Sequence, residues 1–157
     1  MAFSAPSLKG RALRLLSQRE HSRAELERKL AKHEEEPGTL AKALDELAAK
    51  DFISEPRVVA SVLHQRAARS GALRVKQELQ AKGIAPEAIA QAVAGLQETE
   101  VERATALWRR RFDAPPADAK ERAKQMRFLM ARGFSGAVVS KVLRSDFDDP
   151  SDDPSGE

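Results

Sequence analysis

The stretch QELQAKGI, residues 77–84, recurs fifty residues later as RFLMARGF, residues 127–134. In both, a leucine precedes a glycine by four positions and an apolar residue follows the glycine. Glycine readily adopts the left-handed conformation that ends a helix, and the apolar side chain after it can fold back onto that helix. Each stretch therefore predicts a helix end, and the recurrence indicates a chain built on a repeat.

Apolar positions also coincide when the chain is aligned with itself at an offset of 49 or 50 residues. The aligned sets are Leu30, Leu79 and Leu129; Leu40, Ile89 and Val139; and Leu44, Val93 and Leu143. Leu40, Leu44 and Leu47 have the i, i+4, i+7 spacing of a helix with one buried face. A module of roughly 50 residues is only marginally stable alone, so neighbouring modules are expected to share apolar contacts.

The predicted fold class is all-α: an elongated array of three tandem three-helix repeats with about nine helices. The repeats are expected over residues 8–53, 54–98 and 99–145. The helices are expected near residues 8–19, 22–33, 38–50, 55–69, 72–82, 86–97, 100–112, 119–132 and 136–145. Three starts have a capping side chain followed three residues later by a carboxylate. These pairs are Ser22 with Glu25, Thr99 with Glu102, and Asp118 with Glu121.

Composition excludes several classes of protein. The chain has no cysteine, which excludes disulfides, thiolate catalysis and iron–sulfur clusters. No stretch approaches the ~18 apolar residues of a membrane span, and MAFSAPSLKGR lacks the apolar core of a signal peptide. Aromatic residues are only 4% of the chain, too few for an extended base-stacking platform. We therefore expect a cytoplasmic protein that does not enter a membrane.

The net charge of +3 conceals an uneven distribution. The tail DFDDPSDDPSGE, residues 146–157, holds six acids and no base, and its composition predicts disorder. Residues 1–145 contain 27 Lys and Arg against 18 Asp and Glu, a formal charge of +9. Such a basic body predicts a polyanionic or acidic partner.

The sequence offers little support for catalysis. It has no HExxH motif, no glycine-rich phosphate loop and no GxSxG motif. His21, His33 and His64 have no metal-ligand spacing and are expected at the surface or at its boundary. We therefore predict no catalytic residues, no metal site, no cofactor and no enzymatic activity.

Basic clusters are the most informative residues. The third repeat is the most cationic, and its only acids are Glu100, Glu102, Asp113, Asp118 and Glu121. The candidate partner-binding residues are Arg66, Arg69, Arg74, Lys76, Arg109, Arg110, Arg111, Lys120, Arg122, Lys124, Arg127 and Arg132. An alternative is that they only solvate exposed faces and complement helix C-termini. Trp108 shares a face with apolar neighbours and is predicted to lie in the core.

Three ordered segments resemble the RecX regulators of the RecA recombinase. REHSRAELERKL, residues 19–30, resembles that family's opening REHS-x-x-EL-x-x-KL, and VKQELQAKGI, residues 75–84, resembles its I-x-x-EL-x-x-KGI. Arg111-Phe112, KERA at 120–123 and FLMARGF at 128–134 resemble its RRF, KERA and FLxxRGF. Departures occur at Ser70-Gly71-Ala72, where the family commonly has Gly-Tyr-Gly-Pro, and at residues 54–59, where it favours Asp-Asp-x-Arg-Phe-Ala.

The resemblance implies an inhibitory modulator that lies in the groove of the RecA filament on DNA and hinders ATP hydrolysis and strand exchange. Its partners are then the RecA filament and the DNA within it, and we expect a monomer. The alternative is an autonomous DNA-binding protein, because a three-helix module can present a helix to the major groove. A third interpretation is a passive helical scaffold.

Overall fold

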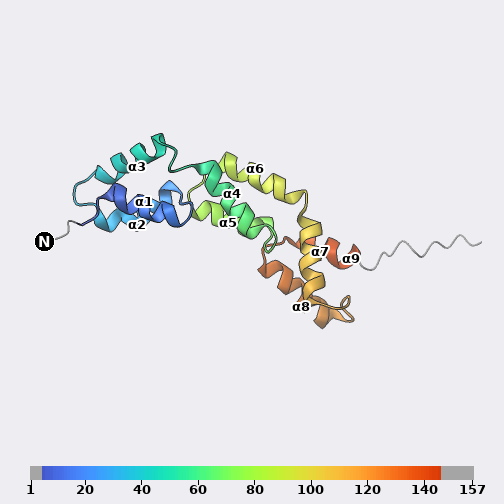
Figure 1. Ribbon diagram of the computed structural model, residues 1–157. Helices are drawn as coiled ribbons and strands as arrows, with labels where there is room; N and C mark the ends of the chain where they lie inside the picture. The colour runs from blue at the N-terminus through green and yellow to red at the C-terminus, as the bar shows by residue number, and fades with distance from the viewer. Residues whose placement is uncertain (1–4, 146–157) are drawn as a thin grey trace, which may run out of the picture. The chain divides into compact units, whose positions relative to one another are not determined.

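The structure, a computed structural model, describes residues 5–145 (Figure 1). These residues form nine α-helices, one short 3-10 helix and no β-strand, which confirms the all-α prediction. In chain order they are α1 (Leu8–Gln18), α2 (Arg23–Leu30), η1 (Ala31–His33), α3 (Thr39–Ala49), α4 (Glu55–Arg66), α5 (Ala72–Ala81), α6 (Pro86–Gln97), α7 (Glu100–Arg111), α8 (Ala119–Ala131) and α9 (Gly136–Ser145). The predicted disordered tail, residues 146–157, lies outside the described residues.

Helix α4 ends at Arg66, three residues earlier than the sequence pattern predicts. In a continuing helix the amide of Gly71 would bind the carbonyl of Ala67. Instead, the amide of Gly71 donates to the carbonyl of Arg132 at 2.7 Å. The carbonyl of Ala67 accepts a hydrogen bond from Nη1 of Arg103, also at 2.7 Å. Contacts made by residues far along the chain therefore end this helix.

The predicted helix starts are mostly confirmed. At α2 the amide of Glu25 donates to Oγ of Ser22 at 3.1 Å, and the amide of Ser22 donates to Oε1 of Glu25 at 3.2 Å. At α8, Oδ1 of Asp118 accepts from the amide of Glu121 at 2.8 Å. Helix α7 begins at Glu100 with Thr99 as its N-cap residue, as predicted, but the Thr99 side chain makes no capping hydrogen bond to α7. Its hydroxyl instead accepts a hydrogen bond from the Arg103 side chain.

The chain divides into two compact units that interleave in sequence. Among the described residues, unit 1 contains 5–63 and 78–89, and unit 2 contains 64–77 and 90–145. In unit 1, helices α1, α2 and α3 pack against one another (Figure 1). The buried cluster that these three helices share consists of Ala12, Leu26, Leu30, Leu40, Leu44 and Leu47.

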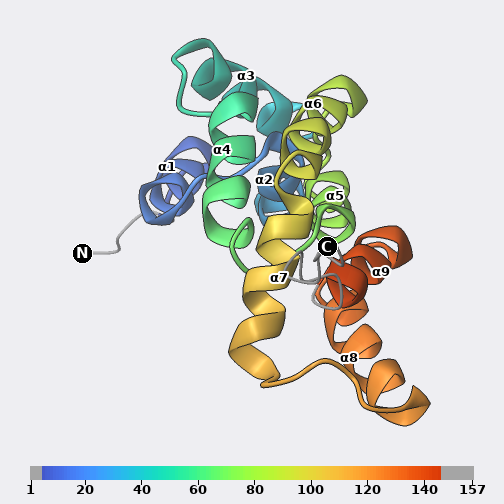
Figure 2. The same ribbon diagram turned by 90° about the vertical axis from the view of Figure 1, so that its right-hand side faces the viewer.

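Unit 2 contains α7, α8 and α9, which pack against one another, as Figure 2 shows in yellow to red. Their shared core is Ala104, Leu107, Trp108, Phe112, Leu129, Phe134, Val139, Val142 and Leu143. Trp108 is 3% exposed, which confirms its predicted core position. Its indole Nε1 donates to Oε1 of the buried Gln125 at 2.8 Å, so the polar edge of the ring is also satisfied.

The predicted glycine turns after α5 and α8 are present. Gly83 and Gly133 have φ angles of +71° and +91°, in the region that favours glycine. The residue after each glycine donates a backbone hydrogen bond to the helix just ended. The amide of Ile84 donates to the carbonyl of Leu79, and the amide of Phe134 donates to the carbonyl of Leu129. All four of these apolar side chains are buried, as the recurrence predicts.

His21 lies in the core, and its predicted surface position is wrong. The ring is 1% exposed, whereas His33 is half-buried and His64 exposed. Nδ1 of His21 lies 3.1 Å from the carbonyl of Arg19, and Nε2 lies 3.0 Å from Nζ of Lys29. The carbonyl accepts, so Nδ1 carries the proton and Nε2 accepts from the lysine. Burial lowers the pKa of His21, consistent with this neutral ring.

Candidate functional site

The cations predicted as partner contacts all belong to unit 2. Arg122 and Arg132 are half-buried, and the other ten are exposed. They occur in two sets, one around the turn between α4 and α5 and the other on α7 and α8. Leaving Arg66 and Arg109 aside, none of them has an ion pair within residues 5–145. Their role as contacts stays a prediction.

The end of α8 is joined to the start of α5 by backbone hydrogen bonds. The amide of Leu73 donates to the carbonyl of Gly133 at 3.2 Å, beside the bond from Gly71 to Arg132. A Cβ atom on Gly71 would overlap the backbone of Gly133. The two backbone segments can therefore approach this closely only because Gly71 has no side chain. Nη1 of Arg74 donates to the carbonyl of Ala131 at 3.3 Å. This junction brings Arg74 next to the end of α8.

Glu100 and Arg103, on the first turns of α7, fix the segment that carries the first set of cations. Oε1 of the buried Glu100 accepts from the amide of Ala72 at 2.9 Å. Nη1 of Arg103 donates to the carbonyls of Ala67 and Ser70, both at 2.7 Å. Desolvation lowers the pKa of Arg103, and the charge of Glu100 opposes that shift. Both residues therefore stabilise the fold of unit 2. Because Glu100 is buried, its carboxylate does not reduce the positive charge of the surface.

Two arginines of the second set lie on a pair of aromatic rings. The rings of Phe112 and Phe128 meet edge to face, with centroids 5.4 Å apart. The guanidinium of Arg111 lies 5.1 Å from the centroid of Phe112, and that of Arg132 lies 5.2 Å from the centroid of Phe128. Cation–π attraction at exposed sites is worth about 0.5–1 kcal/mol, enough to restrict each guanidinium. We call these four residues the arginine–aromatic cluster.

Helix α8 presents a second cationic feature. Lys120, Lys124 and Arg127 follow the spacing i, i+4, i+7 and are all exposed. Residues at this spacing share one helix face. Gln125 and Leu129 on the same helix are buried, so α8 has a core-facing side and a cationic side. We call Lys120, Lys124 and Arg127 the α8 stripe.

Sequence reasoning missed Phe128 and the pair of Glu100 with Arg103. The spacing of Phe128 and Arg132, i and i+4 on a helix, was available as a signal for their contact. The pairing of Phe128 with Phe112 had no such signal, because it joins the end of α7 to the last turn of α8, 16 residues along the chain. The carbonyl partners of Arg103 lie 33 and 36 residues away in sequence.

Three family models cover most of the chain. They describe the first three-helix domain of RecX, matching residues 9–47, the second, matching residues 54–93, and the third, matching residues 98–143. The chain belongs to the RecX family. The matches confirm the prediction of three tandem three-helix repeats.

Curated RecX relatives cover nearly the whole chain. The regulatory protein RecX of Leptothrix cholodnii is 56% identical over 146 residues, covering 92% of this chain and 93% of the relative. That of Ralstonia nicotianae is 51% identical over 138 residues, covering 88% of this chain and 87% of the relative. The names of these relatives give the family a regulatory role.

Solved RecX structures have the same fold. The crystal structure of RecX from Lactobacillus salivarius matches with a TM-score of 0.75 at 20% identity, covering 88% of this chain and 93% of the other. A second RecX crystal structure matches with a TM-score of 0.72 at 22% identity, covering 87% of this chain and 71% of the other. Within residues 5–145 of the present RecX chain, no helix combines the length and apolarity that a membrane span requires.

Proposed function

We propose that this RecX chain is a modulator, mainly an inhibitor, of the RecA recombinase. In this proposal it binds in the groove of the RecA–DNA filament and hinders ATP hydrolysis and strand exchange. Membership of a family of regulatory proteins supports the regulatory part. The observation that carries the choice of partner is the concentration on unit 2 of cations that, Arg66 and Arg109 left aside, make no ion pair within residues 5–145.

A nucleoprotein filament presents phosphates and acidic side chains, which a cationic surface can complement. The proposal needs no covalent chemistry, so the chain acts by binding and not as an enzyme. It places the protein in the cytoplasm as a monomer. It also assigns one three-helix repeat each to residues 8–53, 54–98 and 99–145.

The arginine–aromatic cluster provides a sharp test. Arg111→Glu with Arg132→Glu reverses two charges that have no ion pair within the described chain. The control is Lys42→Glu with Lys50→Glu, which makes the same charge change on and just after α3, outside the candidate surface. Circular dichroism checks whether both variants keep the helicity of the wild type, which we expect.

The assay is the rate of ATP hydrolysis by RecA on single-stranded DNA. We expect the wild type and the Lys42/Lys50 variant to lower the rate at amounts comparable to RecA. The Arg111/Arg132 variant should need at least a tenfold higher concentration for the same inhibition. An unchanged rate at every ratio of wild type to RecA rejects the proposal. Equal inhibition by all three proteins rejects the role of this surface.

The α8 stripe favours a second candidate function, binding to DNA without RecA. Three exposed cations on one helix face can follow a phosphate backbone. Duplex binding measured without RecA separates the two functions. If the wild type binds duplex DNA tightly and leaves the RecA ATPase unchanged, the second function replaces the first.

A further inference from the structure

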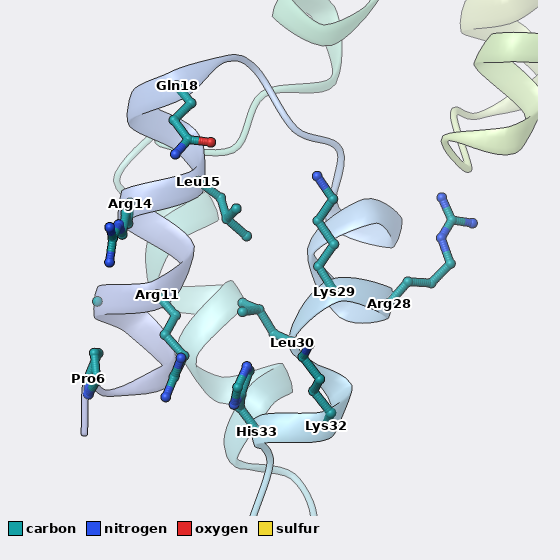
Figure 3. A pocket seen from close by; sticks show the side chains of 11 residues that line it. Pro6, Arg11, Arg14, Leu15, Gln18, Arg28, Lys29, Leu30, Lys32 and His33 are labelled. Atoms are coloured by element: carbon teal, nitrogen blue, oxygen red, sulfur yellow. The ribbon is translucent and has the colours of Figure 1, made fainter.

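Unit 1 contains a hollow of about 570 Å³ between α1 and the segment formed by α2 and η1 (Figure 3). All of its lining residues lie between positions 6 and 33, so it belongs wholly to unit 1. Its volume falls in the range of about 300–1,000 Å³ that is usual for small-molecule sites. It shares no residue with the cationic surface of unit 2.

The walls of the hollow are cationic and part of its lining is apolar. Arg11 and Arg14 extend from α1, and Lys32 extends from η1 on the opposite side (Figure 3). The apolar side chains of Leu15 and Leu30 lie between these two sides. None of the lining residues is an aspartate or a glutamate.

The positive charges of the hollow are not neutralised by ion pairs. Within residues 5–145, Arg11, Arg14 and Lys32 take part in no ion pair. This differs from other cations of unit 1, such as Arg57, whose guanidinium binds both Glu20 and Asp51. Like charges gathered in one concavity repel each other and attract an anion.

The lining contains two further cations, Lys29 and Arg28, and only Lys29 is held at the edge of the hollow. Nζ of Lys29 lies 3.0 Å from Nε2 of His21, so the buried ring fixes the lysine at the edge of the hollow. Arg28 points away from the hollow in Figure 3, and its Nη2 donates to the carbonyl of Ala81 at 2.8 Å. We therefore count Lys29, and not Arg28, among the groups available to a ligand.

His33 also lines the hollow, and its pKa responds to the positive charges nearby. Desolvation lowers the pKa of His33, and the charges of Arg11 and Lys32 lower it further. On its other side, His33 borders a second hollow of about 450 Å³ that shares Arg11 and Lys32 and is also lined by Glu35 and Glu36. Glu35 and Glu36 line only the second hollow, whereas Arg11 and Lys32 line both.

We propose that the first hollow binds a phosphate ester of nucleotide size, with its phosphates on Arg11, Arg14 and Lys32 and its apolar body against Leu15 and Leu30. Four cationic side chains, with Lys29 included, balance the three to four negative charges of a nucleoside triphosphate. The same chemistry is present in a nucleotide unit of a single strand. This site does not depend on the proposed action on RecA.

Direct binding tests the site. The probes are fluorescent ATP and a fluorescein-labelled twelve-nucleotide oligo(dT), titrated separately with the full chain and followed by fluorescence anisotropy. The test variant is Arg14→Ala with Lys32→Ala. The matched control, Lys42→Ala with Lys50→Ala, removes the same charge from unit 1 outside the hollow.

We expect the wild type to bind at least one probe, the test variant to bind it at least tenfold more weakly, and the control to stay within about threefold of the wild type. The probe that shows this pattern identifies the source of the phosphate. Absence of binding to both probes up to millimolar concentration overturns the proposal. So does equal weakening in the two variants, because that result reflects net charge alone.

A nuclear magnetic resonance titration of the His33 ring supplies a readout that needs no variant. A bound anion beside Arg11, Lys32 and His33 stabilises the protonated imidazole, so the pKa of His33 rises when the probe that binds is present. An unchanged pKa of His33 in the presence of saturating probe places the ligand elsewhere and overturns the proposal.

Discussion

Nζ of Lys82 donates a hydrogen bond to Oε1 of Glu25 at 3.0 Å, joining the residue after α5 to the first turn of α2. The second oxygen of Glu25 accepts from Nη2 of Arg19 at 2.7 Å. Burial opposes the ionisation of Glu25, but the hydrogen bonds from Arg19, Lys82 and the amide of Ser22 outweigh it and lower the pKa of Glu25 to about 2. The capping carboxylate of α2 is therefore also the centre of an ion-pair network in unit 1.

This pKa predicts acid sensitivity. Because the folded chain holds Glu25 ionised down to about pH 2, its stabilisation is complete above about pH 4.5, the pKa of an ordinary glutamate, and is lost as the pH falls toward 2. The shift corresponds to at most about 3 kcal/mol. Glu25→Gln, which keeps a capping side chain, should make the free energy of unfolding less dependent on pH over this interval. Urea denaturation at a series of pH values measures it, and parallel curves for both proteins would contradict it.

Gly133→Ala should destabilise unit 2. The φ angle of +91° is unfavourable for alanine, and the added Cβ would overlap Arg74. The left-handed conformation alone costs about 1–2 kcal/mol. Gly95→Ala is the matched control, because a Cβ at Gly95 meets nothing within 4 Å and alanine favours the helix. Thermal unfolding should show a lower midpoint for the first variant and an equal or higher one for the second; equal losses would refute the close approach.

Arg103→Ala should cost more than other arginine substitutions. Its guanidinium donates to the carbonyls of Ala67, Ser70 and Leu96, which then lose a charged donor. Hydrogen bonds to charged groups are worth about 1.5–3 kcal/mol each, so the free energy of unfolding should fall by at least about 2 kcal/mol. Arg127→Ala, on the exposed side of α8, should change it by less than about 0.5 kcal/mol. Chemical denaturation compares the two, and similar losses would show that Arg103 does not fix the turn.

Local chemistry explains how well the helices were predicted. Caps such as Ser22 and turns such as Gly83 act within four or five residues, so their effect can be read from neighbouring letters. The repeat added a second constraint, because Leu79 and Leu129 occupy equivalent positions and must both be buried before a glycine turn. Where a distant group intervenes, the prediction is wrong: Arg103 and Arg132 take the hydrogen-bonding groups that would have extended α4.

The candidate surfaces were predictable only in part, because charge is visible in a sequence and concavity is not. The cations of unit 2 were named from basic clusters in the sequence, but the edge-to-face contact that holds two of them depends on the packing of Phe112 with Phe128. The burial of His21 depends on Lys29 and on the carbonyl of Arg19, and no pattern in the sequence indicates it. The hollow of unit 1 went unrecognised because Arg11 and Lys32 lie far apart in sequence.

The α8 stripe makes a quantitative prediction about salt. Each phosphate neutralised on duplex DNA lowers the slope of log K against log salt by about 0.9. If Lys120 and Lys124 each contact one phosphate, Lys120→Gln with Lys124→Gln should reduce the magnitude of that slope by about 2. Fluorescence anisotropy with a labelled duplex at several salt concentrations measures the slope without RecA.

The control for the stripe is Lys42→Gln with Lys50→Gln, which removes the same charge from α3 and the residue after it. A long-range effect of net charge would weaken binding equally in the two variants, whereas direct phosphate contact changes the slope only for the α8 variant. If the slope of the α8 variant equals that of the wild type while the Arg111/Arg132 variant still loses its effect on RecA, the stripe only solvates α8. The contacts of unit 2 would then be confined to the arginine–aromatic cluster and the turn before α5.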